Sequence, residues 1–208
     1  MRIHKPLTKI LGGSLKVDIL RLFCRTGKEM SGREIARELK ATAPTTNLAL
    51  KELDEEGVLS MKVVGKMHLY SLNKNAWVTQ GLLGPLFKEE RNLSDKFIAT
   101  VAQHVAQSPL KDDILSLSIF GSFARGEEGP VSDIDIFIII KNNRSRGFVE
   151  ELIFNLDKEL FPKIGLSLEP HVNSKADFQK KYKASLPLIK EVMSTHQVVY
   201  GAALKDCL

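Results

Sequence analysis

The sequence predicts a mixed α/β (α+β) protein, in which an N-terminal helical module ending in a β-hairpin precedes a C-terminal domain with a small mixed sheet flanked by helices. Apolar residues recur at helical spacing in the first part of the chain, and short alternating stretches follow Gly57. Two apolar strands, Ile114–Phe120 and Asp133–Ile140, come later. We therefore expect domains at 1–72 and 110–208, joined by a helical connector at 73–109.

Composition excludes several classes of protein. The 208 residues are 43% hydrophobic and 26% charged, which is typical of a globular protein. The longest unbroken apolar run, Ile136–Ile140, is far shorter than the ~20 residues of a membrane-spanning helix. Met1–Leu11 lacks the apolar core of a signal peptide. Two cysteines, Cys24 and Cys207, are too few for a disulfide framework or a zinc knuckle, so we expect a cytoplasmic protein with no membrane partner.

The net charge of +5 lies entirely in the first third of the chain. Residues 1–72 hold 13 Lys and Arg against 8 Asp and Glu, whereas residues 73–208 hold 17 of each. A basic module beside a neutral one indicates that the front of the chain meets a polyanion. A merely soluble basic surface is the alternative.

The N-terminal module contains three predicted helices. The first covers Ser14–Arg25, with Ser14 as its expected N-cap. Ser31 and Glu34 have the spacing of a capping box, which begins a second helix that ends near Lys40. Thr42 caps the third helix, which has Pro44 in its first turn.

A hairpin completes the module. Gly57 ends the third helix, and Val58–Leu72 then forms two short strands that turn at Gly65-Lys66. Three helices followed by a hairpin over residues 8–72 resemble a winged helix-turn-helix. The stretch IARELKATAPTTNLALKELDEEGVL is similar to the two-helix core of small bacterial and archaeal winged-helix regulators.

The resemblance implies that double-stranded DNA is a partner, with the third helix in the major groove and the hairpin near the phosphates. By analogy, it also implies a homodimer. Winged helices serve as protein-contact modules as well, so a protein partner stays open. The expected DNA-binding residues are Thr45, Asn47 and Lys51 on the helix, and Lys62, Lys66 and His68 on the hairpin.

The connector is mostly helical in pattern. We expect Gly81, Gly84 and Pro85 to break it into two helical pieces, because glycine weakens a helix and proline has no backbone N–H to donate.

A pair of carboxylates follows the first strand of the C-terminal domain. Gly121-Ser122 comes directly after Ile114–Phe120, and ten residues separate Ser122 from Asp133-Ile-Asp135. Residues at positions i and i+2 of a strand share a face, so the two carboxylates repel each other unless a cation lies between them. Mg²⁺ prefers such oxygen ligands and also binds substrate phosphates.

The turn before these acids is suited to phosphate. Gly121 and Ser122 lie at a strand-to-helix turn, where backbone N–H groups at the helix N-terminus can bind a phosphate. Arg125 adds a positive charge to the same turn. A turn with incidental acids is the structural alternative.

The run GSFARGEEGPVSDIDIFII resembles the signature of the polymerase-β-like nucleotidyltransferase superfamily, and is most similar to its minimal branch. The resemblance implies Mg²⁺ and a nucleoside triphosphate, expected to be ATP, with nucleotide-binding roles for Gly121, Ser122, Arg125 and Ser132. Asp133 and Asp135 would be catalytic metal ligands.

The family's third carboxylate is matched by Glu169, on a candidate strand at Leu166–Val172 that follows a predicted helix at 148–161. Glu169 would ligate a metal and help to deprotonate the acceptor. Pro170 cannot donate to a sheet ladder, which predicts an edge strand or a bulge. His171 could assist, although an ordinary strand side chain is the favoured interpretation.

Three functions remain open. The first is a DNA-binding transcription regulator whose second domain binds or uses a nucleotide. The second is a transferase whose winged helix recruits a protein or nucleic-acid acceptor, and the third is an antitoxin-like protein that nucleotidylates a partner protein. A misplaced Glu169 would favour a catalytically inactive, nucleotide-sensing regulator.

Overall fold

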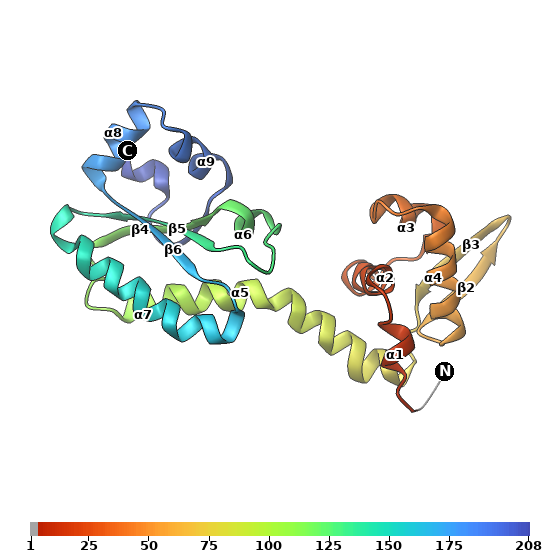
Figure 1. The fold of residues 1–208 in the computed structure, drawn as a ribbon. Helices are drawn as coiled ribbons and strands as arrows, with labels where there is room; N and C mark the ends of the chain where they lie inside the picture. Colours follow the sequence, from red (N-terminus) through yellow and green to blue (C-terminus); the bar gives the residue numbers. More distant parts are fainter. Residues whose placement is uncertain (1–3) are drawn as a thin grey trace. The chain divides into compact units, whose positions relative to one another are not determined.

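A computed structural model describes residues 4–208, so Arg2, one of the basic residues of the first third, lies outside the described part. The chain divides into two compact units, Met1–Leu93 and Ser94–Leu208. Each unit combines helices with one β-sheet, which confirms the predicted fold class (Figure 1).

The first unit contains the three predicted helices and the hairpin. Its sheet has the order β1-β3-β2, because the short β1 pairs with the outer side of the hairpin. Isoleucine, leucine and phenylalanine side chains of α2, α3 and α4 form its core with Val58 and Tyr70. The elements are α1 (Leu7–Ile10), α2 (Ser14–Thr26), β1 (Met30–Ser31), α3 (Gly32–Glu38), α4 (Ala43–Glu55), β2 (Leu59–Val64) and β3 (Met67–Leu72).

The predicted caps are confirmed at two helices and wrong at one. Ser31 and Glu34 form the complete capping box of α3. The Thr42 side chain accepts a hydrogen bond from the Thr45 N–H at the start of α4. Ser14 is already the first residue of α2, and the N-cap is Gly13, which makes no side-chain bond.

The predicted break in the connector is wrong. The π-helical turn η1 (Thr79–Leu83) runs directly into α5 (Gly84–Gln107). The Gly84 N–H bonds to the Thr79 carbonyl five residues back, instead of four. This wider turn accommodates Pro85, whose ring would collide with a carbonyl of a regular α-helix. The glycines and proline therefore widen one turn, and the helix continues.

The second unit is built on a four-stranded mixed sheet of order β6-β5-β4-β7. β5 and β6 are parallel and joined by α7, whereas β4 pairs antiparallel with β5 and β7. β6 is an edge strand, as Pro170 predicts. The elements are β4 (Ile114–Phe120), α6 (Gly121–Arg125), β5 (Ile134–Ile140), η2 (Asn143–Ser145), α7 (Arg146–Ile164), β6 (Leu168–Ser174), α8 (Lys175–Lys183), α9 (Pro187–Thr195), β7 (Gln197–Gly201) and η3 (Leu204–Cys207).

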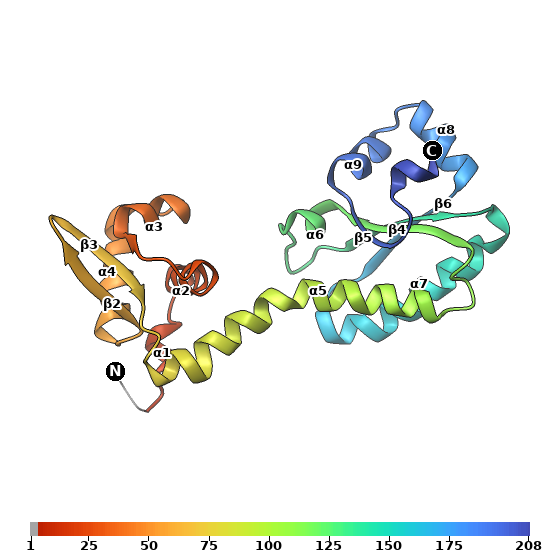
Figure 2. The ribbon, with the colours of Figure 1, turned by 180° about the vertical axis from the view of Figure 1, so that it is seen from behind.

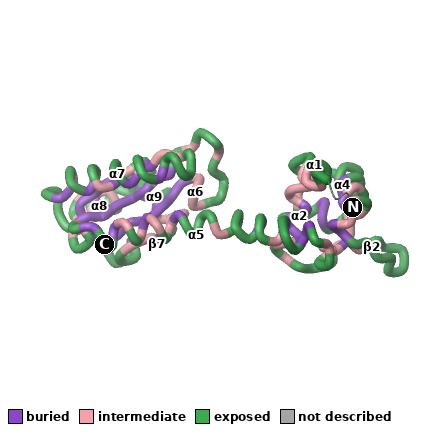
Figure 3. The backbone as a smooth tube through the Cα atoms, turned by 90° about the horizontal axis from the view of Figure 1, so that it is seen from below, coloured by how far each residue is buried: buried purple, intermediate pink, exposed green. Residues whose placement is uncertain are grey.

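Helices cover both faces of this sheet (Figure 2). α7 and the end of α5 pack on one face, against Ile134, Ile136 and other apolar strand residues. α8 and α9 pack on the opposite face, against Phe137 and Ile139. The central strands β4 and β5 are therefore buried between two helical layers (Figure 3). Within residues 4–208, no helix is long and apolar enough to cross a membrane.

Candidate active site

Asp135 and Glu169 are direct neighbours on adjacent strands. The parallel register of β5 and β6 pairs Asp135 with Glu169, and the register continues to Ser174. Residues that are paired in register project from the same face of a sheet. Asp133 lies just before β5 begins. The structure thus places the Asp135 carboxylate and the expected third carboxylate, that of Glu169, side by side on one face of the sheet.

Gly121 makes room for the Asp135 carboxylate. Its φ angle of +73° lies in the left-handed region. A Cβ at this position would overlap Oδ2 of Asp135 and lie 3.3 Å from its Cγ. Glycine is therefore required at this position for two reasons: the backbone conformation, and the close approach of the carboxylate to the turn.

His171 lies beside the same carboxylate. Its Nε2 is 3.6 Å from Oδ1 of Asp135, and its ring lies 5.4 Å from the Phe120 ring, centre to centre. The side chains of His171 and Asp135 are 30% and 32% exposed, so solvent and ligands reach them. His171 thus contacts the site, although it also has an ordinary strand position.

Arg125 is paired with two carboxylates. Its Nε donates to Oε2 of Glu127 at 2.8 Å, and a terminal nitrogen lies 3.6 Å from Oε1 of Glu191 in α9. The hydrogen bond to Glu127 is the main cause that raises the pKa of Arg125. A phosphate at this guanidinium would compete with both carboxylates for its positive charge.

The other predicted phosphate-binding residues close the loop between α6 and β5. The Ser132 hydroxyl oxygen accepts a hydrogen bond from the Gly129 N–H at 2.9 Å. The Ser122 carbonyl accepts one from the Glu127 N–H, also at 2.9 Å. α6 itself has only five residues. Hydrogen bonds within the loop therefore fix its conformation.

The donor chemistry of the site suits magnesium. Asp133, Asp135 and Glu169 offer carboxylate oxygens, which hard divalent cations prefer. Across residues 4–208, no group of three or more His, Cys, Asp or Glu side chains is gathered closely enough to hold a metal ion. The paired Asp135 and Glu169 are the part of the expected ligand set that the register brings together.

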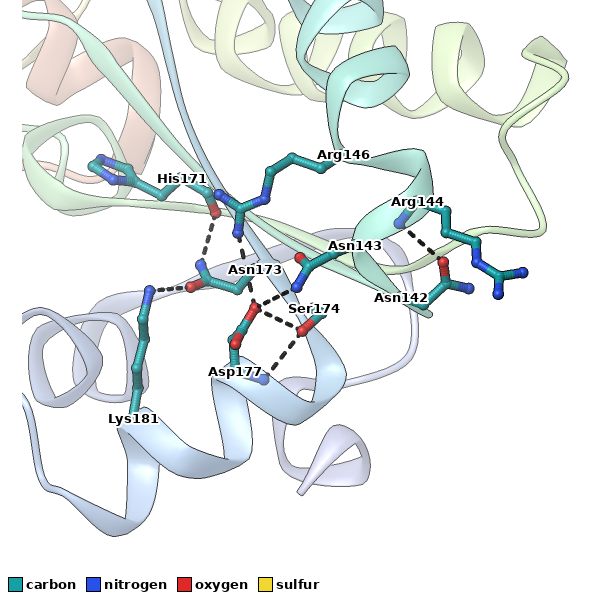
Figure 4. Close-up of polar contacts among 9 residues, drawn as sticks. All are labelled: Asn142, Asn143, Arg144, Arg146, His171, Asn173, Ser174, Asp177 and Lys181. Atoms are coloured by element: carbon teal, nitrogen blue, oxygen red, sulfur yellow. Dashed lines mark hydrogen bonds and ion pairs between the residues drawn. The ribbon is translucent and has the colours of Figure 1, made fainter.

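Sequence reasoning missed a polar chain farther along β6 (Figure 4). Asn173 is 2% exposed, and its Nδ2 donates to the His171 carbonyl at 3.1 Å. The Lys181 ammonium of α8 donates to Oδ1 of Asn173 at 2.5 Å. The signal was the alternation of polar residues Glu169, His171 and Asn173 along one strand face.

On the first unit, the expected DNA-binding residues of α4 are all exposed. The Thr45 hydroxyl donates to the Thr42 carbonyl at 3.0 Å, so it also serves the helix start. The Asn47 carboxamide lies against Gly32. Lys51 pairs with Glu55 at 3.7 Å.

On the hairpin, Lys62 pairs with Glu29, whereas Lys66 and His68 are exposed at the turn. Leu48, which lies between the expected contacts of α4 and which we did not predict, is 60% exposed.

Comparison with known proteins finds a family similarity in the C-terminal domain. Residues 103–203 match the family model "Polymerase beta, Nucleotidyltransferase". This part of the chain is therefore similar to nucleotidyltransferase domains, in agreement with the Gly-Ser turn and the Asp135–Glu169 pair. A curated relative, "Putative protein adenylyltransferase MJ1305" of Methanocaldococcus jannaschii, is 26% identical over 110 residues, which are 52% of this chain and 70% of the relative.

Solved structures give weaker likenesses. Reduced HlyU of Vibrio cholerae has a TM-score of 0.35 at 16% identity, over 42% of this chain and 84% of that one. An E41A mutant of ZitR of Lactococcus lactis has a TM-score of 0.32 at 23% identity, over 45% and 59%. A structure described as a toxin-antitoxin with AMP-PNP has a TM-score of 0.33 at 16% identity, over 55% and 77%. These scores are too low to carry conclusions about this chain.

Proposed function

We propose that the C-terminal domain transfers a nucleotidyl group from a magnesium-bound nucleoside triphosphate, ATP being the expected one, to a hydroxyl of an acceptor. The acceptor oxygen would bond to the α-phosphorus, and the β- and γ-phosphates would leave as pyrophosphate. The observation that carries this proposal is the in-register pair Asp135 and Glu169, held beside the Gly121 turn. The family match over residues 103–203 supports the reaction class.

The metal-binding and the phosphate-binding residues would lie on different sides of β5. Asp133, Asp135 and Glu169 would hold Mg²⁺, which supplies positive charge that offsets the charge of the phosphates. Gly121, Ser122 and Ser132 would line the phosphate side at β4 and α6, and Arg125 would exchange Glu191 or Glu127 for a phosphate oxygen. Glu169 would accept the proton of the attacking hydroxyl.

A protein hydroxyl is the acceptor that we propose. The support is the curated relative, whose name assigns it the adenylylation of proteins. Free nucleic acid ends are the competing acceptor class, since the same carboxylates would serve any hydroxyl.

We further propose that the first unit binds double-stranded DNA, so that the chain is a transcription regulator carrying a transferase domain. The unit contains the three helices α2, α3 and α4 followed by the hairpin, and residues 1–72 carry the entire excess of positive charge. Lys66 and His68 would approach phosphates, and Thr45, Asn47 and Lys51 would lie in the major groove. A homodimer would match a two-fold symmetric operator.

Transfer is tested by incubating the full chain with α-labelled ATP, magnesium and a cell extract. Wild type should label a macromolecule, whereas Asp135→Asn should not. Glu169→Gln should lose labelling but keep magnesium-dependent ATP binding, because the two aspartates still hold a metal. Unaltered labelling by Asp135→Asn would refute the proposed site. ATP binding without any transfer by wild type would favour the nucleotide-sensing alternative.

DNA binding is tested with duplex DNA at several salt concentrations. Affinity should fall steeply with salt, because phosphate contacts release counterions. Lys66→Gln should weaken binding and reduce the salt slope by about one, whereas the matched change Lys163→Gln on α7 should not. Equal effects of the two substitutions would contradict the assignment of DNA binding to the first unit.

A further inference from the structure

Leu48 is an exposed apolar residue on the face of α4 that is turned away from the core of the first unit. Its side chain is 60% exposed, and it lies in the N-terminal half of the helix. The buried residues of α4 are Thr46, Ala49, Leu50 and Leu53. At about 3.6 residues per turn, Leu48 lies on the opposite side of the helix from this buried stripe. A single exposed leucine is common on protein surfaces, and what distinguishes Leu48 is its position.

The spacing of residues joins Leu48 to the expected DNA contacts. Thr45, Leu48 and Lys51 are three residues apart, and residues at this spacing are neighbours on a helix surface. In helix-turn-helix proteins, the N-terminal residues of the second helix contact base edges in the major groove. If α4 enters the groove as proposed above, with Lys51 near the phosphates, Leu48 lies against the base pairs.

The two polar residues expected to contact bases are held by contacts within the protein. The Thr45 hydroxyl donates to the Thr42 carbonyl at 3.0 Å. The Asn47 carboxamide oxygen lies directly against Gly32. Hydrogen bonds from these groups to bases would compete with those contacts, whereas the exposed Leu48 side chain can meet a base without such competition. An apolar contact is therefore the contact that this face of α4 is best prepared to make.

Thymine is the base that matches a leucine in the major groove. Its C5-methyl group projects into that groove, where the other bases present hydrogen-bond donors and acceptors. A leucine beside the methyl group removes apolar surface of both groups from water. A leucine over a G·C pair would instead cover donors and acceptors that it cannot satisfy, which costs free energy. The contact would thus favour thymine and disfavour a G·C pair.

We propose that Leu48 is a specificity-determining residue, which contacts the C5-methyl group of a thymine at a fixed position of the DNA sequence that the chain binds. This inference rests on the proposed DNA binding of the first unit, and it adds the kind of base that the unit recognises. Because the contact is made to one methyl group, removal of that group should weaken binding about fourfold.

The test uses duplex DNA that the full chain selects from a random-sequence library. The selected duplexes should share a thymine at a fixed position. In the duplex that binds most tightly, each thymine is replaced in turn by deoxyuridine, which lacks the methyl group, and fluorescence anisotropy measures the affinity. At the contacted position, wild type should bind the deoxyuridine duplex about fourfold more weakly than the thymine duplex.

Three variants assign this difference to one side chain. Leu48→Ala should bind the thymine and deoxyuridine duplexes with equal affinity, and Leu48→Met, which keeps a long apolar side chain, should retain the preference for thymine. Leu86→Ala is the matched control, because Leu86 is a 48% exposed leucine of α5, and it should retain the whole difference. Circular dichroism should show that Leu48→Ala is folded, since the lost side chain is exposed and alanine favours a helix.

The outcomes separate this inference from the proposed function. If wild type binds duplex DNA in a salt-dependent manner but loses no affinity at any deoxyuridine, the role of Leu48 is overturned and the DNA-binding proposal stands. If Leu48→Ala keeps the preference for thymine, another residue contacts the methyl group and the inference is equally wrong. If wild type binds no duplex, the DNA-binding proposal fails, and the inference fails with it.

Discussion

Replacing Gly121 with alanine should damage both the fold and the proposed nucleotide site. The residue has a φ of +73°, and an added Cβ would overlap Oδ2 of Asp135. Gly126, five residues on, provides a matched control, because its φ is +66° and an added Cβ would have nothing within 4 Å. The two substitutions share the backbone penalty, and only one disturbs a carboxylate.

The magnitude follows from these two contributions. Alanine in the left-handed region costs about 1–2 kcal/mol. Moving the Asp135 carboxylate away from its preferred rotamer costs about 0.5–1.5 kcal/mol more. We therefore expect Gly126→Ala to lower the free energy of unfolding by about 1–2 kcal/mol, and Gly121→Ala by about 1.5–3.5 kcal/mol.

Urea unfolding followed by circular dichroism measures the stability of both variants, and calorimetry measures their magnesium–ATP binding. Gly126→Ala should bind ATP as wild type does once it is folded, whereas Gly121→Ala should lose most of its affinity. The reasoning is refuted if the two variants bind ATP equally, because the close approach to Asp135 would then have no functional role.

Three further predictions concern single contacts. Ser31→Ala removes the side-chain half of the capping box of α3, in which the Ser31 hydroxyl oxygen accepts from the Glu34 N–H at 3.4 Å, and should cost about 1 kcal/mol of unfolding free energy; Ser14→Ala, which removes no cap, should cost less, and equal losses in urea titrations would contradict the assignment. Arg21 donates to Glu90 at 2.7 and 2.8 Å, and this hydrogen bonding lowers the pKa of Glu90. The stability that wild type gains over Glu90→Gln should therefore be present above the ordinary carboxyl pKa and disappear as the pH falls through the lowered value, and a difference that is the same at about pH 7 and about pH 3 would argue against it. Burial raises the pKa of the Cys207 thiol, which is 3% exposed, so iodoacetamide should label it slowly in the folded chain and rapidly in urea; fast labelling of the native protein, detected by mass spectrometry, would show that the C-terminal turn is not packed as described.

Most of the C-terminal site could be predicted from the sequence, because local signals and sheet periodicity agree there. Each sequence signal dictates one structural feature. The Gly-Ser pair forms a turn, the alternating acids share one face of a strand, and the proline requires an edge strand or a bulge. The pairing of Asp135 with Glu169 needed the strand register, which the family spacing suggested and the structure provides. The metal ligands and nucleotide contacts themselves stay predictions.

What the sequence could not predict depends on contacts between distant residues. Lys62 on β2 pairs with Glu29, which lies directly before β1, so no local pattern indicates that this lysine is neutralised. Lys181 is held by Asn173 across a strand-to-helix turn. At Pro85, local propensity predicted a break, but packing on both sides of the π turn keeps the helix continuous.

The parallel register of β5 and β6 gives apolar residues far from any chemistry a role in placing Glu169. Leu168 and Val172 are 6% exposed each and anchor β6 in the core on the opposite face of the sheet. A slip of one residue would turn Glu169 into that core and expose its apolar neighbours. The geometry of the carboxylates is thus encoded partly in the packing beneath them, and substitutions at Leu168 or Val172 could alter activity while leaving every polar residue of the site in the sequence.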